Sequence, residues 1–336
     1  MLIICFFTNI SLGSVYIPIK SVFNSLIGSA TEQETWQHII QNYRLPKAIT
    51  AIIVGSGLGI SGLLMQTLFR NPLAGPFVLG ISSGASLGVA LVILGSGVFG
   101  GVFASLFISK WGIVLAASLG SFLVLLSVLM VSLKVRDTMA ILIIGLMFAS
   151  ITAAIVSVLS YFGSAQQLQQ YIFWGFGSLG NLSWDEIFIF FLIYAIGILI
   201  SIISIKSLNT LLLGENYAKS LGLNIKKSRL IIIIATSLLA GTITAFAGPI
   251  AFIGLAIPHL TRQVFNTSNH KILLPAVFLF GAIVMLICDS IAQLPNSDFT
   301  LPINAITSLI GAPVVIWLLV RKRKMIFFFS FQKTER

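Results

Sequence analysis

Charged residues are scarce in this sequence of 336 residues. Only 9% of the residues are Asp, Glu, Lys or Arg, whereas 57% are hydrophobic, and soluble domains carry about 25% charged residues. A soluble fold would have too little polar sequence to cover apolar runs of this length. The composition therefore predicts an all-α, polytopic integral membrane protein, because a helix satisfies its own backbone hydrogen bonds inside a bilayer.

Residues that commonly carry chemistry are also scarce. Cys5 and Cys288 are isolated in apolar surroundings, and the three histidines lie in different loops, so no metal site is predicted. The sequence contains no P-loop motif, and residues 57–62 spell G-x-G-x-x-G only in the middle of an apolar segment, without the strand that a dinucleotide site needs. We therefore expect no catalytic residue, no metal and no cofactor bound by this chain. A chain of this kind that moves a solute uphill must take its energy from a partner or an ion gradient.

Ten apolar segments predict about ten transmembrane helices. The first and the eighth are shorter than the ~20 residues that a spanning helix needs, so the first helix is expected to be either truncated or wrongly assigned at its start. The whole chain, 1–336, is expected to form a single transmembrane domain that ends in a basic cytoplasmic tail at 321–336. The predicted segments are 1–15, 47–69, 78–96, 112–132, 139–162, 187–205, 229–247, 250–265, 272–293 and 303–320.

Lysine and arginine are distributed unevenly between the loops. With the carboxyl terminus placed in the cytoplasm, sixteen of them fall in inner segments and four in outer segments, as the positive-inside rule requires. The net charge of +11 is therefore expected to face the anionic cytoplasmic leaflet rather than a nucleic acid.

Prolines and glycines interrupt the apolar sequence between residues 247 and 262. Pro249 and Pro258 each remove a backbone donor, and Gly254 adds flexibility between them. Broken backbone at membrane depth is tolerated only where protein or a water-filled cavity satisfies it. The residues alone fit either a kinked helix with an interfacial arginine or a broken element at a functional site.

The amino-acid sequence of this interrupted segment resembles the signature of the FecCD family, the permease subunits of bacterial ABC importers for ferric siderophores, haem and cobalamin. Residues 248–262 match the family pattern G-P-I-x-F-x-G-L-x-x-P-H-x-x-R at every specified position. Further matching blocks lie at 44–47, 62–85, 301–303 and 310–313, so the resemblance covers nearly the whole chain. Signature residues with an implied structural role are Asn71, Pro72, Gly248, Pro249, Gly254, Pro258, Gly311 and Pro313.

The resemblance implies the fold of a type II ABC importer permease in a bacterial cytoplasmic membrane. It implies a second permease subunit, identical or paralogous, and two cytoplasmic ATPase subunits that bind ATP and Mg. It also implies an extracytoplasmic substrate-binding protein. A ferric siderophore is the first expected substrate, and haem and cobalamin are the alternatives. An ion-coupled secondary transporter would also explain the spans and the broken helix, but it predicts a cluster of ionisable residues at the midplane, which the sequence does not contain.

The resemblance also implies roles for particular residues. Residues 214–222 have the composition of a short amphipathic loop helix that ends at a cap glycine, and the resemblance makes this loop the ATPase coupling region. The coupling residues are then Glu215, Ala218 and Gly222, supported by His259 and Arg262.

Two more sets of residues follow from the resemblance and from the charge pattern. Arg44 and Lys47 are expected to dock the binding protein, although a cation at this position also suits simple anchoring to lipid headgroups. Asp289 is expected to have a structural role, because Gln293 stands where relatives often carry a partner arginine. The expected translocation pathway contains Ser150, Thr152, Ser157, Ser160, Asn304 and Thr307.

Overall fold

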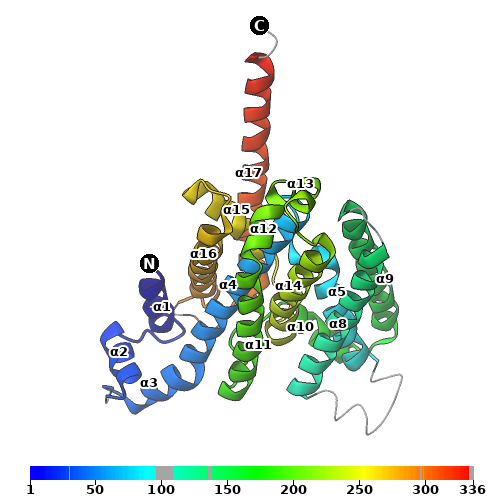
Figure 1. The fold of residues 1–336 in the computed structure, drawn as a ribbon. Helices are drawn as coiled ribbons and strands as arrows, with labels where there is room; N and C mark the ends of the chain where they lie inside the picture. The colour runs from blue at the N-terminus through cyan, green and yellow to red at the C-terminus, as the bar shows by residue number, and fades with distance from the viewer. Residues whose placement is uncertain (30, 96–108, 135–137, 296, 298, 333–336) are drawn as a thin grey trace.

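The described residues of the computed structural model are 1–29, 31–95, 109–134, 138–295, 297 and 299–332, and their regular secondary structure is entirely helical (Figure 1). The first half comprises α1 (Leu2–Ser11), α2 (Ile19–Ile27), α3 (Glu34–Ile39), the π-helical turn η1 (Ile40–Arg44), α4 (Leu45–Leu68), the 3-10 turn η2 (Pro76–Leu79), α5 (Ile81–Ile93), α8 (Lys110–Lys134) and α9 (Thr138–Phe162). The second half comprises α10 (Ala165–Gly175), α11 (Trp184–Ile203), α12 (Ile205–Leu212), α13 (Glu215–Ser220), α14 (Ile225–Ala247), α15 (Ile253–Phe265), α16 (His270–Ala292) and α17 (Ile303–Gln332).

Six helical segments in the described residues are long and apolar enough to cross a membrane. They are 34–68, which runs through α3, η1 and α4, and segments of α8, α9, α11, α14 and α16. The other four predicted segments coincide with the shorter helices α1, α5, α15 and the first part of α17. The predicted helical fold class is therefore confirmed, and the short first and eighth segments are α1 and α15.

The third segment differs from its prediction. Its helix, α5, has only 13 residues because the chain first forms η2 and then turns at Gly80, which has a φ of 72°. The sequence pattern did not reveal this turn, since η2 is as apolar as the helix that follows it. The end of that predicted segment, at residue 96, lies outside the described residues, as do residues 333–336 of the predicted basic tail.

Helix α4 forms the centre of the bundle, and 89% of its most apolar window is buried within the chain. Its glycines explain how neighbouring backbones come so close. A Cβ added to Gly55 would lie 2.2 Å from the carbonyl oxygen of Gly281 in α16, and one on Gly62 would lie 1.7 Å from that of Gly254 in α15. Small residues at helix contacts drive packing in lipid, where the hydrophobic effect between helices is absent.

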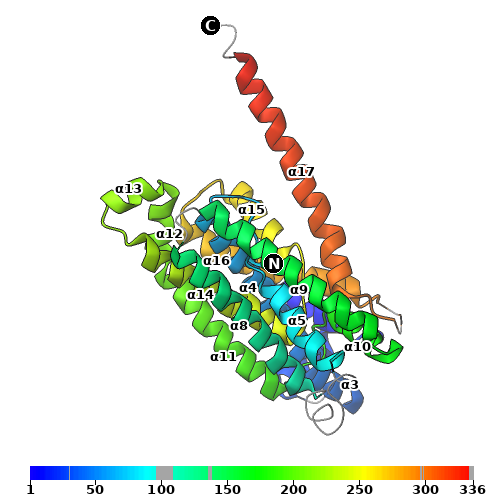
Figure 2. The same ribbon diagram turned by 90° about the vertical axis from the view of Figure 1, so that its right-hand side faces the viewer.

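The two ends of the bundle are named here by their loop helices. The α13 face contains α12, α13, the last turn of α4, the end of α15 and the start of α16 (Figure 1). The α3 face contains α2, α3, the start of α4 and the end of α16. Helix α17 extends beyond the α13 face (Figure 2). Helix α9 lies at the edge of the bundle, with only 11% of its apolar window buried, so most of its surface is free for lipid or another subunit.

Candidate functional site

The signature stretch is a true break between two helices. Helix α14 ends at Ala247, and Gly248 adopts a φ of 76° with an extended ψ of 178°. A Cβ on Gly248 would lie 2.8 Å from the carbonyl oxygen of Trp174, so this position requires glycine both for its dihedral angles and for its space. Phe252, also at positive φ (65°), precedes the first residue of α15. The broken element is therefore present, and a continuous kinked helix is not.

Two neighbouring segments satisfy the backbone of this break. The side-chain oxygen of Asn304, in α17, accepts a hydrogen bond from the Ala251 backbone N–H at 3.0 Å. The backbone N–H of Ser178 donates to the Ala247 carbonyl at 2.8 Å. Gly311 of α17 packs against the side chain of Phe252: a Cβ added to Gly311 would lie 2.4 Å from the Phe252 Cβ. The signature glycine Gly311 and the predicted pathway residue Asn304 thus both hold the break in place.

Two adjoining hollows border the break, and they share Ser82 and Pro249. The larger, about 420 Å³, lies between α5, α9 and α10. It is lined by Ser82, Ser83, Ser86, Ala149, Thr152, Ala153, Val156, Ser157, Tyr171 and Pro249. The smaller, about 290 Å³, is lined by residues 249–252 of the break together with Leu58, Pro76, Phe77, Ser82, Ala240, Thr244, Gly254, Leu255 and Asn304. Both volumes are near or within the range of ~300–1,000 Å³ that is usual for small-molecule sites.

Three of the six predicted pathway residues line the hollows. Thr152 and Ser157 line the larger hollow and Asn304 the smaller. Ser150 and Ser160 lie on α9 outside both linings. Thr307 also lies outside both linings: its side chain is 0% exposed, and its hydroxyl donates to the Asn304 carbonyl at 3.1 Å. Within the described chain it faces the packed interior, and its place in the pathway stays a prediction.

At the α13 face, the last turn of α4 bonds directly to α16 and α15, and α12 is bonded to this end of the bundle through His270 and Arg70. Thr67 contacts the Nε2 atom of the buried His270 in α16 at 2.8 Å, and the other ring nitrogen of His270 lies 2.8 Å from Oδ1 of Asn209 in α12. Since an amide oxygen can only accept, this geometry places the hydrogen on Nδ1 of His270. The His270 side chain therefore links α12 to the core of the bundle.

Two arginines complete these connections. Arg70 donates to the Leu211 carbonyl at the end of α12 at 2.8 Å. Arg262 donates at 2.8 Å to the side-chain oxygen of Gln66, whose amide nitrogen donates to the Leu255 carbonyl at 3.1 Å. The predicted support residue Arg262 is thus bonded to α4. His259 lies one turn earlier on α15, as its spacing predicts.

The loop helix α13 ends as the sequence predicts. Gly222 has a φ of 82°, its N–H donates to the Lys219 carbonyl at 2.9 Å, and the Leu223 N–H donates to the Ala218 carbonyl at 3.0 Å. This is the Schellman arrangement of a glycine cap. No atom lies within 4 Å of a Cβ added to Gly222, so within the described chain a side chain there is disfavoured by its dihedral angles and not by space.

Two predicted coupling residues are placed differently from expectation. Ala218 is 0% exposed and packs in the core, so within the described chain its side chain faces the bundle, and its part in coupling stays a prediction. Glu215 forms an ion pair with Arg229 of α14 at 3.2 Å. The exposed apolar side chains of this loop are instead Leu213, Tyr217 and Leu221. Sequence reasoning missed them, although apolar residues in a polar cytoplasmic loop were a visible signal.

At the α3 face, Arg44 closes the end of α1. Its guanidinium donates to the carbonyls of Ile10 at 2.7 Å and Ser11 at 2.9 Å, and also to the carbonyl of Val15. A Cβ on Gly13 would lie 2.7 Å from the guanidinium, which explains the glycine there. The last carbonyls of a helix lack partners within the helix, and Arg44 satisfies them with a cation at the negative end of the helix dipole.

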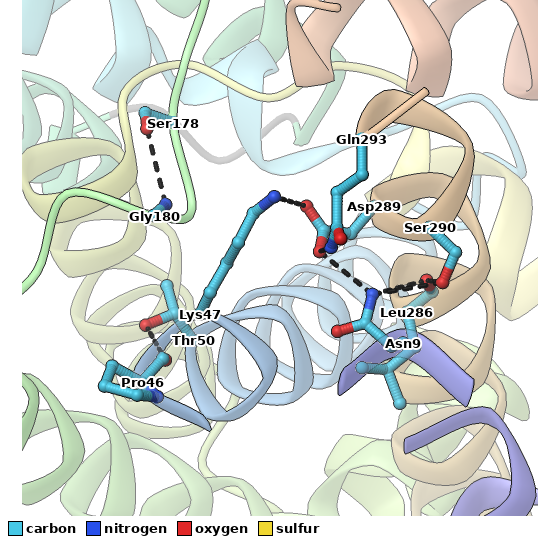
Figure 3. Close-up of polar contacts among 10 residues, drawn as sticks. All are labelled: Asn9, Pro46, Lys47, Thr50, Ser178, Gly180, Leu286, Asp289, Ser290 and Gln293. Atoms are coloured by element: carbon cyan, nitrogen blue, oxygen red, sulfur yellow. Dashed lines mark hydrogen bonds and ion pairs between the residues drawn. The ribbon is translucent and has the colours of Figure 1, made fainter. Parts of the chain in front are cut away.

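Lys47 forms an ion pair with the buried Asp289 at 3.0 Å (Figure 3). The second carboxylate oxygen of Asp289 accepts from Asn9 of α1 at 2.9 Å and from Gln293 at 2.7 Å. Asp289 therefore joins α1, α4 and α16. Lys47 supplies the positive charge that was expected from an arginine at the position of Gln293. Both predicted docking cations, Arg44 and Lys47, are bonded within the chain.

Comparison with known proteins identifies relatives along the whole chain. The family model of the FecCD transport family matches residues 1–321. The vitamin B12 import system permease protein BtuC of Klebsiella pneumoniae is 37% identical over 288 residues, which is 85% of this chain and 84% of that protein. The hemin transport system permease protein HmuU of Yersinia pestis is 34% identical and covers 94% of this chain and 93% of its own length.

Solved structures show the same fold. A putative metal-chelate type ABC transporter in an inward-facing conformation superposes with a TM-score of 0.83 at 30% identity, covering 95% of this chain and 96% of its own. PsaBC from Streptococcus pneumoniae, in complex with Fab, superposes with a TM-score of 0.56 at 18% identity, covering 90% of this chain and 95% of its own. The second match concerns the fold alone.

Proposed function

Since the chain belongs to the FecCD transport family, we propose that it is the membrane-spanning permease subunit of an ABC importer that carries a ferric siderophore into the cell. The observation that carries the transport role is the broken segment 248–252, which borders two hollows between helices. Broken backbone at membrane depth occurs where it lines a path or a binding site. The alternative cargoes, haem and cobalamin, are favoured by the relatives that import hemin and vitamin B12.

The chain works with three kinds of partner in this proposal. A second permease subunit, identical or paralogous, packs beside α9, which is largely uncovered within one chain. The sequence has no P-loop of its own, so ATP and Mg are bound by two separate ATPase subunits. These subunits dock on the α13 face. The exposed side chains of Leu213, Tyr217 and Leu221, next to the capped Gly222, suit a protein cleft. Glu215 lies at the base of the same loop.

The orientation follows from the distribution of positive charge. The α13 face contains the lysine- and arginine-rich segments, so it is assigned to the cytoplasm together with the carboxyl terminus. The α3 face then meets the extracytoplasmic substrate-binding protein. Arg44 and Lys47 lie there, and their internal bonds give them a second role in shaping the docking surface. Cysteine labelling from outside should reach positions near Glu32 and Asp185 and should miss positions near Lys226; the reverse pattern would contradict this orientation.

Reconstitution tests the function directly. The chain, its ATPase and its binding protein are placed in proteoliposomes, and uptake of a ferric siderophore, haem and cyanocobalamin is measured with and without ATP. We expect ATP-dependent uptake of the ferric siderophore. Uptake of haem or cobalamin alone would reassign the cargo while keeping the importer. Uptake driven by an ion gradient in the absence of ATP would instead support a secondary transporter.

A further inference from the structure

The larger hollow has a wall of hydroxyl groups that comes from three helices. Six of its ten lining residues carry a hydroxyl, and we call these six the hydroxyl wall. Ser82, Ser83 and Ser86 come from α5, Thr152 and Ser157 from α9, and Tyr171 from α10. Each of these hydroxyls needs a hydrogen-bond partner when it is removed from water, and the partners decide which of them are free to bind a molecule in the hollow.

The hydroxyl wall can both donate and accept hydrogen bonds. Thr152 and Ser157 donate to carbonyls of their own helix at 2.8 and 2.9 Å, so each keeps oxygen lone pairs for another donor. The hydroxyls of Ser86 and Tyr171 bond to each other. Ser82 and Ser83 form no hydrogen bond with other described residues. These two hydroxyls therefore remain available as donors and as acceptors to a molecule in the hollow.

The described side chains that line the hollows carry no charge. Neither the ten residues of the larger hollow nor the thirteen of the smaller include Asp, Glu, Lys, Arg or His. The charged side chains described above gather instead at the α3 and α13 faces. Burying an ion where no opposite charge is present costs far more than burying a neutral polar group that finds hydrogen-bond partners. The lining is thus polar enough for amides and hydroxyls and unsuited to ions.

We propose that the hydroxyl wall contacts the cargo and selects metal chelates with no net charge. This inference rests on the proposed function, in which the cargo is a metal chelate. Fe(III) bound by three singly charged hydroxamates is neutral and presents amide and carbonyl groups, which match the hydroxyls. Fe(III) bound by three doubly charged catecholates keeps three negative charges, and haem keeps ionised propionates. In the hollow, the negative charges of the tricatecholate and of haem would have no positive side chain to compensate them, so their entry is disfavoured.

Direct binding tests the selection apart from transport. The permease–ATPase complex is placed in nanodiscs of uncharged lipid, without the binding protein, and equilibrium binding of two iron-labelled chelates is measured. The probes are a neutral ferric trihydroxamate and a trianionic ferric tricatecholate. Ser83 is the position to change, because its hydroxyl forms no bond that a substitution would break. Ser83→Lys and Ser83→Glu introduce opposite charges, and Ser83→Gln controls for bulk.

We expect the wild-type complex to bind the neutral chelate at least about tenfold more tightly than the anionic one. Ser83→Lys should raise the relative affinity for the anionic chelate, Ser83→Glu should lower it, and Ser83→Gln should leave the ratio unchanged. The ratio is independent of how much protein is folded, because both chelates are measured on one preparation. The inference would be overturned by equal affinities for the two chelates, by tighter binding of the anionic chelate, or by no binding of either. It would also be overturned if the affinity ratio were the same for the Lys and Glu variants at position 83. ATP-driven uptake in the reconstituted importer would still stand as the test of the proposed function.

Discussion

Each face of the bundle contains one ion pair in the described structure, and the two pairs differ in which partner is buried. Lys47 and Asp289 meet at the α3 face, where the Asp289 side chain is 2% exposed and that of Lys47 is 22% exposed. Arg229 and Glu215 meet at the α13 face, where the buried partner is the cation: the Arg229 side chain is 9% exposed and that of Glu215 is 33% exposed. Two amides also donate to the Asp289 carboxylate, so its loss would leave three groups without their acceptor. The loss of Asp289 should therefore cost more than the loss of Glu215.

Removing Asp289 should give the largest effect. Asp289→Leu leaves Lys47, Asn9 and Gln293 without their acceptor, and we expect a loss of about 3–5 kcal/mol in the free energy of unfolding. Unfolding in mixtures of SDS and mild detergent measures this quantity. Lys47→Met combined with Asp289→Leu should recover more than half of the loss, because no unpaired ion remains. A double variant as unstable as the single one would show that the ion pair is not what holds this face together.

Changing Arg44 separates its two assigned roles. Arg44→Lys keeps the charge but loses the planar guanidinium that reaches three carbonyls at the end of α1. We expect a loss of about 1.5–3 kcal/mol in the free energy of unfolding. Uptake per folded transporter should remain near the wild-type value if the positive charge docks the binding protein. Arg44→Glu should lose both stability and uptake. Equal uptake by the Lys and Glu variants would remove Arg44 from the docking site.

A neutral change at the α13 face should have a smaller effect. Thr67→Val leaves the Nε2 atom of His270 without its partner, at an expected cost of about 1–3 kcal/mol. Thr50→Val is the matched control, since Thr50 is equally buried in α4 but bonds only to the Pro46 carbonyl of its own helix. ATPase co-purification should fall for Thr67→Val and stay unchanged for Thr50→Val. The same stability for both variants would mean that the contact between Thr67 and His270 does not hold α16 against α4.

The smallest effects on stability should occur on α13 itself. Gly222→Ala penalises the left-handed backbone by about 1 kcal/mol, and Gly222→Asn should cost less, because asparagine tolerates this conformation. If the glycine serves only as a cap, Asn should support full uptake. If the loop enters a cleft on the ATPase, both variants should lose uptake and ATPase association. Glu215→Gln keeps a side-chain oxygen that can accept from the buried Arg229, so we expect its cost to stay at about 1 kcal/mol.

The sequence predicted local features better than it predicted contacts between distant segments. Gly222 was assigned to a helix cap from the composition of its loop, and the break beside Gly248 was one of two interpretations of the prolines and glycines there; both glycines have positive φ. The pairing of Lys47 with Asp289 could not be predicted, since helical periodicity does not say which neighbour a face meets. The burial of Ala218 and Thr307 could not be predicted for the same reason, and both are 0% exposed in the described chain.

The contact between Gly62 and Gly254 has a mechanical consequence. No side chain, not even a methyl group, fits between these two backbones, so α4 and α15 cannot be pressed closer together at this point. The contact therefore acts as a rigid pivot between the two helices and cannot be compressed. A force applied at the Arg262 end of α15 passes to α4 without first compressing any side chains. The broken segment lies on the opposite side of Gly254 from Arg262, so a small tilt of α15 at one end of this short helix moves the backbone beside the hollows at the other.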